Sequence, residues 1–304
     1  MQNDFWANIS VNKLMKKLII ILGTISISMS AIFGRLSTAP SVILVFYRML
    51  FAVALLLPVV LIKCKNELKD LKKMDILRCA CSGLFLGMHF TLYFQSLKYT
   101  SIAAAVVLVN MEVFFVAIVM MLVWHEKIPA KGLLGIVVAF LGTVIIAVAD
   151  MGGGTNVVLG DIFAFVGSLC VAIYTMIGKK CRERISTSVY TCFVYGFAAL
   201  TVAAAAIVTG TPFTGYNPMN LAYAFGMTIF CTFLGHSVYS WGLKYLSASY
   251  ITTIKLLEPL FAAVLGFFFF GEVPGILVVI GGCVIVAGIL WYSKIDAERE
   301  QQSD

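Results

Sequence analysis

Four charged residues lie inside apolar stretches that are long enough to cross a membrane: Arg48, Glu112, Lys255 and Glu258. A charged side chain at the bilayer centre costs at least about 2.5–3.5 kcal/mol on insertion scales, so intramembrane charges usually serve a function and neutralise one another. Two of these residues are positive and two are negative, which makes the set neutral. They are therefore the first candidates for a site that binds a substrate or couples to an ion.

Glu112 stands at the middle of the apolar stretch 100–124, twelve residues from either edge. A carboxylate in this place could bind an amine or a proton. The alternative is a structural role, as a partner of Arg48 or as a packing group linked to Asn110. Since no second candidate carboxylate lies inside a stretch of the first half, the sequence predicts that Arg48 pairs with Glu112, and a buried pair of this kind is costly to break.

Lys255 and Glu258 are three residues apart, so a continuous helix would place them on one face and let them pair. Pro259 has no N–H, and its ring clashes with the carbonyl of Lys255, so a helix kink is expected beside the pair. Broken helices near mid-membrane build binding sites in this way. We expect Glu258 to be an exchangeable group, since burial and Lys255 act on its protonation in opposite directions. The alternative is a self-neutralised pair that only kinks the helix.

Two histidines, His89 and His236, lie at nearly matching positions of the two halves of the chain. Each has a tyrosine within one helical turn, Tyr93 for His89 and Tyr239 for His236. Histidine titrates near neutral pH and could relay protons. A histidine that is hydrogen-bonded and only packs the core is the alternative for both.

The elements that carry these residues follow from composition. Hydrophobic residues make up 61% of the 304-residue chain and charged residues only 12%, with a mean hydropathy of +0.98. A membrane-spanning helix needs about 20 mostly apolar residues. Lipid admits only helices and closed barrels, and these stretches are too long for barrel strands. The sequence therefore predicts an all-α membrane protein with ten transmembrane helices, at 18–37, 41–62, 76–97, 100–124, 132–149, 160–178, 187–209, 220–243, 248–270 and 274–293.

The first of these stretches also fits a signal peptide, with three lysines ahead of it and Ser28-Met29-Ser30 as a cleavage site. Because the apolar run continues past these residues, we interpret it as a span. The eight cysteines form no C-x-x-C spacing, and most lie in apolar runs, where a free cysteine acts as a small hydrophobe.

Lysine and arginine are concentrated on one side of the predicted topology. If the N-terminus is cytoplasmic, 18 of the 22 basic residues lie in cytoplasmic segments, and only Arg35 and Lys98 lie in outer loops. Cytoplasmic loops of membrane proteins carry such an excess. Both termini are therefore expected in the cytoplasm of a multi-pass protein of the cell membrane. The net charge of +7 follows from topology and does not indicate nucleic-acid binding.

An internal repeat appears when the chain is shifted by 146 residues. Twelve of the 50 positions from 93 to 142 then match without a gap, and the clearest block is Leu97-Lys98-Tyr99-x-Ser101 against Leu243-Lys244-Tyr245-x-Ser247. The predicted repeats are 18–149 and 160–293. Each repeat has five spans, and an odd number places the second copy in the membrane with inverted orientation. Inverted repeats are typical of proteins that work by alternating access.

The same residues resemble the EamA branch of the drug/metabolite transporter superfamily over nearly the whole chain, about 18 to 293. The similar features are Phe46-Tyr47-Arg48, Leu97-Lys98-Tyr99-Thr100-Ser101, Glu126, Gly160-Asp161, Glu258-Pro259-Leu260-Phe261 and Gly271-Glu272. The resemblance implies a secondary transporter of a small polar or amphipathic metabolite such as an amino acid or amine, with export favoured over import. It also implies a cavity between the first, third, fourth, sixth, eighth and ninth spans. One departure is Val113, which stands where Pro259 stands in the second repeat, so the fourth span is expected to be less broken.

The same residues bear on competing functions. A membrane-embedded enzyme or lipid-modifying protein would want a polar cluster at one interface, whereas the unusual polar residues here lie at mid-membrane. His125-Glu126 lacks the second histidine of a zincin, and Gly152-Gly153-Gly154 lacks the Lys-Ser/Thr of a P-loop. We expect no enzyme activity, cofactor or metal. The expected partners are a small-molecule substrate, protons as an open alternative, and the lipid bilayer. A homodimer is a weaker alternative, suggested by small-residue faces at Gly135, Gly142, Gly281 and Gly288.

Overall fold

The computed structural model describes residues 12–100, 102–148, 156–271 and 273–301. Ser101, Gly152–Gly154 and Glu272, which were singled out in the sequence, lie outside these ranges. Ten helical spans are long and apolar enough to cross a membrane, and the secondary structure of the described ranges is helical, without strands. The predicted all-α membrane protein with ten transmembrane helices is confirmed.

The first five spans begin and end close to the predicted residues. Helix α1 starts after Asn12, whose side chain accepts a hydrogen bond from the Met15 backbone N–H at 2.9 Å, the usual role of an N-cap. A short helix, α3 (Lys65–Asp70), follows the second span and was not predicted. The spans of this repeat are α1 (Lys13–Leu36), α2 (Ser41–Lys63), α4 (Lys73–Ser96), α5 (Ile102–Asn110) with α6 (Glu112–Val123), and α7 (Ala130–Val148).

The next five spans form the second repeat. Ser247, from the repeated Leu-Lys-Tyr-x-Ser block, caps α12 by accepting a hydrogen bond from the Tyr250 N–H at 3.1 Å. The spans are α8 (Val157–Cys181), α9 (Thr187–Val208), α10 (Met219–Met227) with the π-helix η1 (Thr228–Ser237) and α11 (Val238–Gly242), α12 (Ala248–Lys255) with α13 (Glu258–Phe270), and α14 (Ile276–Gln301).

The two repeats run through the bundle in opposite directions. The start of α1 meets the end of α14 through a Lys17–Asp296 ion pair, and Arg184 after α8 pairs with Asp75 at the start of α4. We call this end, which includes α3, the basic end. The start of α8 lies at the opposite end, where Asp161 accepts a hydrogen bond from Thr100 at 2.7 Å. The first repeat thus begins at the basic end and the second begins at the opposite end.

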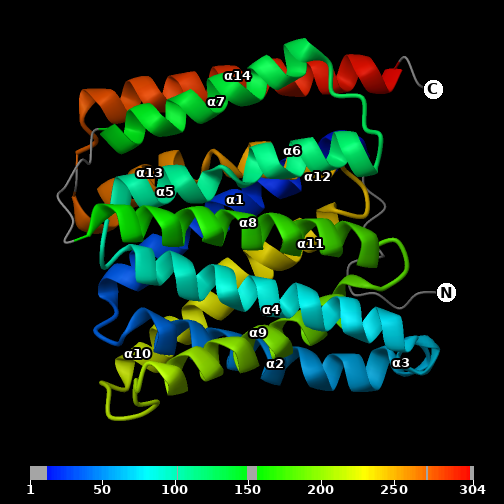
Figure 1. The fold of residues 1–304 in the computed structure, drawn as a ribbon, viewed down its shortest axis with the longest axis vertical. Helices are drawn as coiled ribbons and strands as arrows, with labels where there is room; N and C mark the ends of the chain where they lie inside the picture. The colour runs from blue at the N-terminus through cyan, green and yellow to red at the C-terminus, as the bar shows by residue number, and fades with distance from the viewer. Residues whose placement is uncertain (1–11, 101, 149–155, 272, 302–304) are drawn as a thin grey trace.

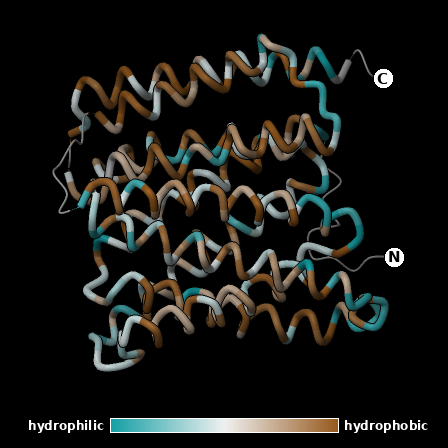
Figure 2. Tube along the Cα trace, viewed as in Figure 1, coloured by the Kyte–Doolittle hydropathy of each residue, from teal (hydrophilic) through white to brown (hydrophobic). Residues whose placement is uncertain are grey.

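The hydropathy trace agrees with this arrangement. In Figure 2 the long helices are mostly brown, and teal segments gather at the helix ends, most visibly around α3 and the turn after α8. Many large apolar side chains point outward along the spans, for example Leu22 of α1 at 61% and Leu200 of α9 at 65% exposure. Exposed apolar side chains on the middle of the helices are what a lipid-facing surface requires.

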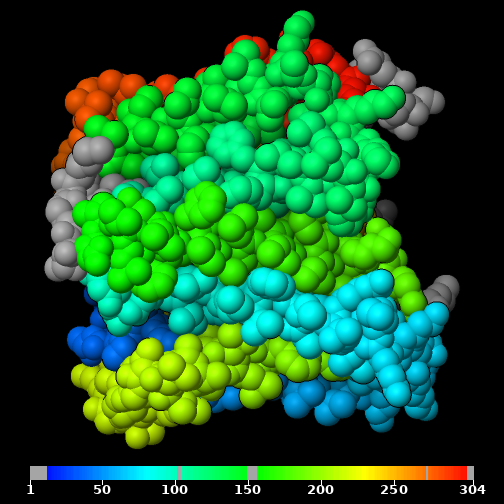
Figure 3. Space-filling model, in the orientation of Figure 1, coloured from blue at the N-terminus to red at the C-terminus, as the bar shows by residue number. Residues whose placement is uncertain are grey.

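The helices stack in rows across the bundle (Figure 1). Helices α7 and α14 form a pair at one edge, and α4 lies between α8 and α9, which the space-filling view shows in close contact on the viewed face (Figure 3). The glycines predicted to form smooth faces join α7 to α14 inside one chain. A Cβ at Gly142 would lie 2.6 Å from the Gly281 carbonyl oxygen, and one at Gly288 would lie 2.7 Å from that of Gly135. A homodimer would therefore need a different surface.

Two spans, one in each repeat, are broken at the same repeat position. The ninth span ends α12 at Lys255 and starts α13 at Glu258, with Pro259 in the first turn of α13. The fourth span ends α5 at Asn110 and starts α6 at Glu112, although Val113 stands in the place of the proline. The fourth span is interrupted at one residue, Met111, and the ninth at two, Leu256 and Leu257, which agrees with the expectation that the fourth span is less broken. A Met111 N–H to Leu108 carbonyl bond of 3.2 Å closes a tighter turn there instead of continuing the α-helix.

The eighth span contains a π-helix of ten residues, Thr228–Ser237, between two α-helical segments. In a π-helix the hydrogen bonds run from i to i+5, which is rare and occurs often at functional sites. Its counterpart in the first repeat, within α4, is a regular α-helix. The π-helix carries His236 and Thr232, two residues that face the centre of the bundle.

Candidate functional site

The broken spans bring four helix ends together at the level of the bundle centre. Helices α5 and α12 end there with Asn110 and Lys255, and α6 and α13 begin there with Glu112 and Glu258. Each carboxylate lies in the first turn of its half-helix, where the N-terminal end of the helix dipole stabilises negative charge. The inverted repeat therefore places two equivalent carboxylates at two inward-pointing helix N-termini.

Glu112 is buried and fully engaged. Its carboxylate forms a salt bridge with the Lys255 ammonium of the other repeat and accepts a hydrogen bond of 2.8 Å from Thr175 of α8. The side chain of Glu112 is only 6% exposed and that of Lys255 is 13% exposed. Because both charges are buried and opposed, the pair is internally neutral and links the two repeats across the centre.

The predicted pairing of Lys255 with Glu258 is wrong for this structure. The prediction assumed a continuous helix, in which residues three apart share a face. The break at Leu256 and Leu257 separates the two residues into different helices, so Lys255 turns to Glu112 of the first repeat.

The predicted pairing of Arg48 with Glu112 is also wrong. The Arg48 Nε donates a hydrogen bond of 2.6 Å to the Thr232 hydroxyl of the π-helix, and the guanidinium lies over the Phe90 ring at 5.1 Å. Arg48 is 2% exposed, and its Nη2 has no hydrogen-bond partner among the described residues. Lys255 of the second repeat pairs with Glu112 instead. Arg48 is therefore a buried cation with a nitrogen, Nη2, that still lacks a hydrogen-bond acceptor among the described residues.

Glu258 is the less engaged of the two carboxylates. Its backbone carbonyl accepts a 3.2 Å hydrogen bond from Ser28 of α1, which holds the start of α13 against that helix. Within the described residues no lysine, arginine or histidine lies at salt-bridge distance from its carboxylate. The side chain is half-buried, so its carboxyl group is partly accessible.

Aromatic rings connect Arg48 to the Glu112–Lys255 pair. Phe90 contacts His236 edge-on at 5.6 Å between ring centroids, and His236 contacts Tyr239 at 6.4 Å. The Lys255 ammonium lies 5.8 Å from the centre of the Tyr239 ring, whose hydroxyl donates to Thr24 at 3.0 Å. The sequence-predicted residues Arg48, His236, Tyr239, Lys255 and Glu112 thus lie along one continuous path.

His89 and Tyr93 form a second pair beside this path. Their rings stack at 6.3 Å with an interplanar angle of 10°, and His89 Nδ1 lies 3.0 Å from the Gly167 carbonyl oxygen of α8. Phe90 is the next residue along α4 and touches His89 at 5.4 Å. These contacts fit a hydrogen-bonded packing histidine, and a role in proton transfer stays a prediction.

The sequence did not point to several polar residues of the site. Thr175 and Thr232 complete the hydrogen bonds of Glu112 and Arg48, and Thr24 orients Tyr239. Threonine is common in transmembrane helices and its hydroxyl often bonds to its own backbone, so nothing in the sequence distinguishes these three from the many others. Phe90 is one of 23 phenylalanines, and nothing in the sequence distinguishes it from the others.

A separate cluster of ion pairs lies at the basic end. Arg299 of α14 bonds to Glu126 after α6 at 3.0 Å and to Asp296 at 2.8 Å, and Asp296 also meets Lys17 of α1 at 3.5 Å. Glu126, noted in the sequence for its family resemblance, is therefore part of a link between three spans. No group of three or more His, Cys, Asp or Glu residues suited to a metal occurs among the described residues.

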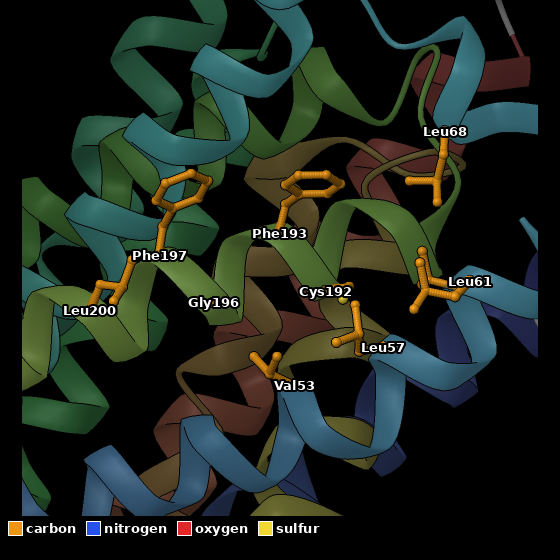
Figure 4. Close-up of a pocket in the computed structure, with 10 residues that line it drawn as sticks. Val53, Leu57, Leu61, Leu68, Cys192, Phe193, Gly196, Phe197 and Leu200 are labelled. Atoms are coloured by element: carbon orange, nitrogen blue, oxygen red, sulfur yellow. The ribbon is translucent and has the colours of Figure 1, made fainter. Parts of the chain in front are cut away.

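Hollows on the surface of the described residues lie away from the charged centre, and two are relevant here. The larger, of about 460 Å³, is apolar and lies between α2 and α9 (Figure 4). The smaller, of about 150 Å³, lies at the end opposite the basic end and is lined by Tyr47 and the residues around Asn217.

Comparison with known proteins places these features in a family. The family model described as "EamA-like transporter family" matches residues 14–148 and 158–294. A transporter from Archaeoglobus fulgidus is 28% identical over 81% of this chain and 85% of its own length. One from Clostridium kluyveri is 29% identical over 70% and 71%. Both are named uncharacterized transporters. A protein of known crystal structure, 16% identical, shares the fold with a TM-score of 0.80 over 95% of this chain and 99% of its own.

Proposed function

Because the chain belongs to the EamA-like transporter family, we propose that it exports a small polar or amphipathic metabolite across the cytoplasmic membrane by alternating access. Family and relatives support a transporter rather than an enzyme, and the proposal concerns what is carried and how. The observation that carries it is the charged centre, where two inverted repeats meet at their broken helices.

The charges of this centre favour an amino acid over a simple amine. Lys255 and Glu112 neutralise each other, which leaves Arg48, with its unpartnered Nη2, and Glu258 as the two groups of the centre without an ion pair among the described residues. A zwitterion offers a carboxylate to Arg48 and an ammonium to Glu258, and guanidinium–carboxylate contacts are among the stronger hydrogen bonds in proteins. The rings of Phe90, His236 and Tyr239 lie beside Arg48 and Lys255 and would contact an apolar side chain of the substrate.

Unequal packing at the two ends supports alternating access. Toward the basic end, α6 packs on α12, and their buried residues, such as Val116 and Ile251, belong to one apolar core. The equivalent halves toward the opposite end, α5 and α13, pack mainly on α8 and α1 instead of on each other. This packing supports our proposal of a state that is closed at the basic end. Exchange of these two arrangements between the repeats would close the opposite end and open the basic one.

The basic residues support one direction of the chain in the membrane. We place the basic end, and with it both ends of the described chain, in the cytoplasm. Single cysteines at Lys69 and Gly215, which are exposed at opposite ends, test this in a Cys-free background. Labelling in intact cells with an impermeant maleimide is expected at position 215 and not at 69. Labelling of both positions from outside would reject the topology.

Transport is tested in reconstituted vesicles by counterflow of labelled amino acids against the matching amines. We expect amino acids to exchange faster than amines that lack the carboxylate. Glu258→Gln is expected to keep the fold and to lose gradient-driven uptake, whereas Glu298→Gln, an exposed glutamate of α14, serves as the matched control. Normal, pH-independent transport by Glu258→Gln would show that this carboxylate is structural. Equal exchange rates for amines and amino acids would contradict the proposal that the substrate is a zwitterion, without contradicting the proposal that the protein is a transporter.

A further inference from the structure

The apolar hollow between α2 and α9 is a groove on the lipid-facing side of the bundle (Figure 4). We call it the α2–α9 groove and define it by Val53, Leu57 and Leu61 of α2, Phe193 and Gly196 of α9, and Leu68 of α3. Gly196 forms its floor. A Cβ at this position would meet only one heavy atom within 4 Å, the Val53 Cγ2 at 3.9 Å, so the space above the glycine is open.

The length of the groove matches one leaflet of a bilayer. Val53 is near the middle of α2, and Lys63 is the last residue of that helix. Ten residues of α-helix rise about 15 Å, which is half of the roughly 30 Å hydrocarbon thickness of a bilayer. The lining of the groove runs from Val53 to Leu61 in this part of α2 and continues at Leu68 of α3, so the groove extends from near the bilayer midplane toward the membrane surface at the basic end, as an acyl chain of that leaflet does.

Two lysines stand at the surface end of the groove. Lys63 follows the groove residue Val60 by three positions in α2, and Lys65 precedes Leu68 by three in α3. Residues three apart share a helix face, so both lysines lie on the groove side of their helices. Both are exposed. The nearby Glu67 is directed elsewhere, because its carboxylate accepts a 2.5 Å hydrogen bond from the Ser186 N–H at the start of α9.

We propose that the α2–α9 groove binds an anionic phospholipid, with one acyl chain in the groove and the phosphate group beside Lys63 and Lys65. The apolar lining matches the chain in chemistry and in length, and the lysines match the charge of the headgroup. An acyl chain in the groove would contact α2 and α9 together and stabilise the packing of these helices. This site is distinct from the charged centre and does not depend on the transported substrate.

Native mass spectrometry of the full chain tests the proposal, with dioleoyl-phosphatidylglycerol and dioleoyl-phosphatidylcholine added in equal amounts. The wild-type protein is expected to retain phosphatidylglycerol in preference. The double variant Lys63→Gln with Lys65→Gln should lose this preference. Each lysine is expected to contribute about fivefold to the ratio of phosphatidylglycerol to phosphatidylcholine retained, since a basic residue near an anionic surface contributes on that scale. The control pair Lys127→Gln and Lys131→Gln lies at the same end, in the segment between α6 and α7 and at the start of α7, and is expected to keep the preference.

Filling the groove tests the acyl-chain part of the site. Gly196→Leu places a side chain in the open space and is expected to lower retention of both lipids, whereas Gly34→Leu, at an equally open helical glycine of α1, should not. The thermal midpoint of both variants checks that they fold. Equal retention of the two lipids by the wild type, or wild-type retention by Gly196→Leu, would overturn the proposal. If the wild-type protein is a dimer and Gly196→Leu dissociates it, the groove binds a second copy of the chain, and this result would also overturn the proposal.

Discussion

The two broken spans have the same place in the repeat and differ in almost every contact. In the first repeat the break has no proline, and the carboxylate that follows it, Glu112, is buried in a salt bridge and a hydrogen bond. In the second repeat Pro259 follows the break, and the equivalent carboxylate, Glu258, is half-buried without an ion pair among the described residues. Lys255, which directly precedes the second break, pairs with Glu112 of the first repeat and not with Glu258.

This difference shows how two equivalent elements take different roles. The first break is held by contacts from outside its own span, namely Lys255 and Thr175. The second break is favoured locally, since proline is well suited to the first turn of a helix and removes an N–H that has no partner there. We therefore expect the first break to be important for stability and the second for movement and ligand binding.

The largest expected effect is the loss of Glu112. Glu112→Leu leaves Lys255 as an unpaired buried charge, and breaking such a pair costs roughly 3–5 kcal/mol of folding stability. Glu258→Leu should cost much less, because no ion pair is lost. Thermal unfolding of the purified proteins measures both. The double variant Glu112→Leu with Lys255→Leu should recover part of the loss, and equal losses for Glu112→Leu and Glu258→Leu would contradict the comparison.

Proline substitutions test whether the first break is real. Val113→Pro places proline in the first turn of α6, where it should cost less than about 1 kcal/mol, because proline is tolerated there. Val116→Pro, one turn further and fully buried, should cost about 3 kcal/mol or more. Folded yield and thermal midpoint report the difference. If both variants lose stability equally, the fourth span is continuous.

A double-mutant cycle shows which cation Glu112 prefers. The coupling energy between Glu112 and Lys255 should exceed about 1 kcal/mol, whereas that between Glu112 and Arg48 should stay below about 0.5 kcal/mol, the limit within which non-contacting sites add. Leucine at each position, alone and in pairs, supplies the cycles, with unfolding free energy as the readout. A stronger coupling for Arg48 would restore the pairing that the sequence suggested.

The smallest expected change in stability is that of Pro259→Ala. Because the first repeat forms its break without proline, the second break should persist, and stability should change by less than about 1 kcal/mol. Turnover should fall more than substrate affinity. With alanine at position 259 the backbone regains an N–H, which could bond to the carbonyl of Lys255 and make the hinge stiffer. Kinetics of exchange in vesicles measure both. A large loss of affinity with unchanged turnover would show that Pro259 shapes the binding site and not the hinge.

Sequence alone determined the spans, their number and the inversion of the repeats. Insertion into a bilayer depends on the apolar content of about 20 consecutive residues, which is a local property and can be read along the chain. The shift of 146 residues and the odd number of spans predicted the inversion, and Pro259 predicted the second break, because the chemistry of proline acts within one turn.

Tertiary structure decided the partners. Lys255 turned to a carboxylate 143 residues away instead of one three residues away, and Arg48 found the Thr232 hydroxyl. The break before Glu112, the π-helix and the closure of α7 on α14 through glycines also arise from contacts between spans. A buried charge takes whichever opposite group lies within a few ångströms, and that distance is set by how helices remote in sequence pack against each other.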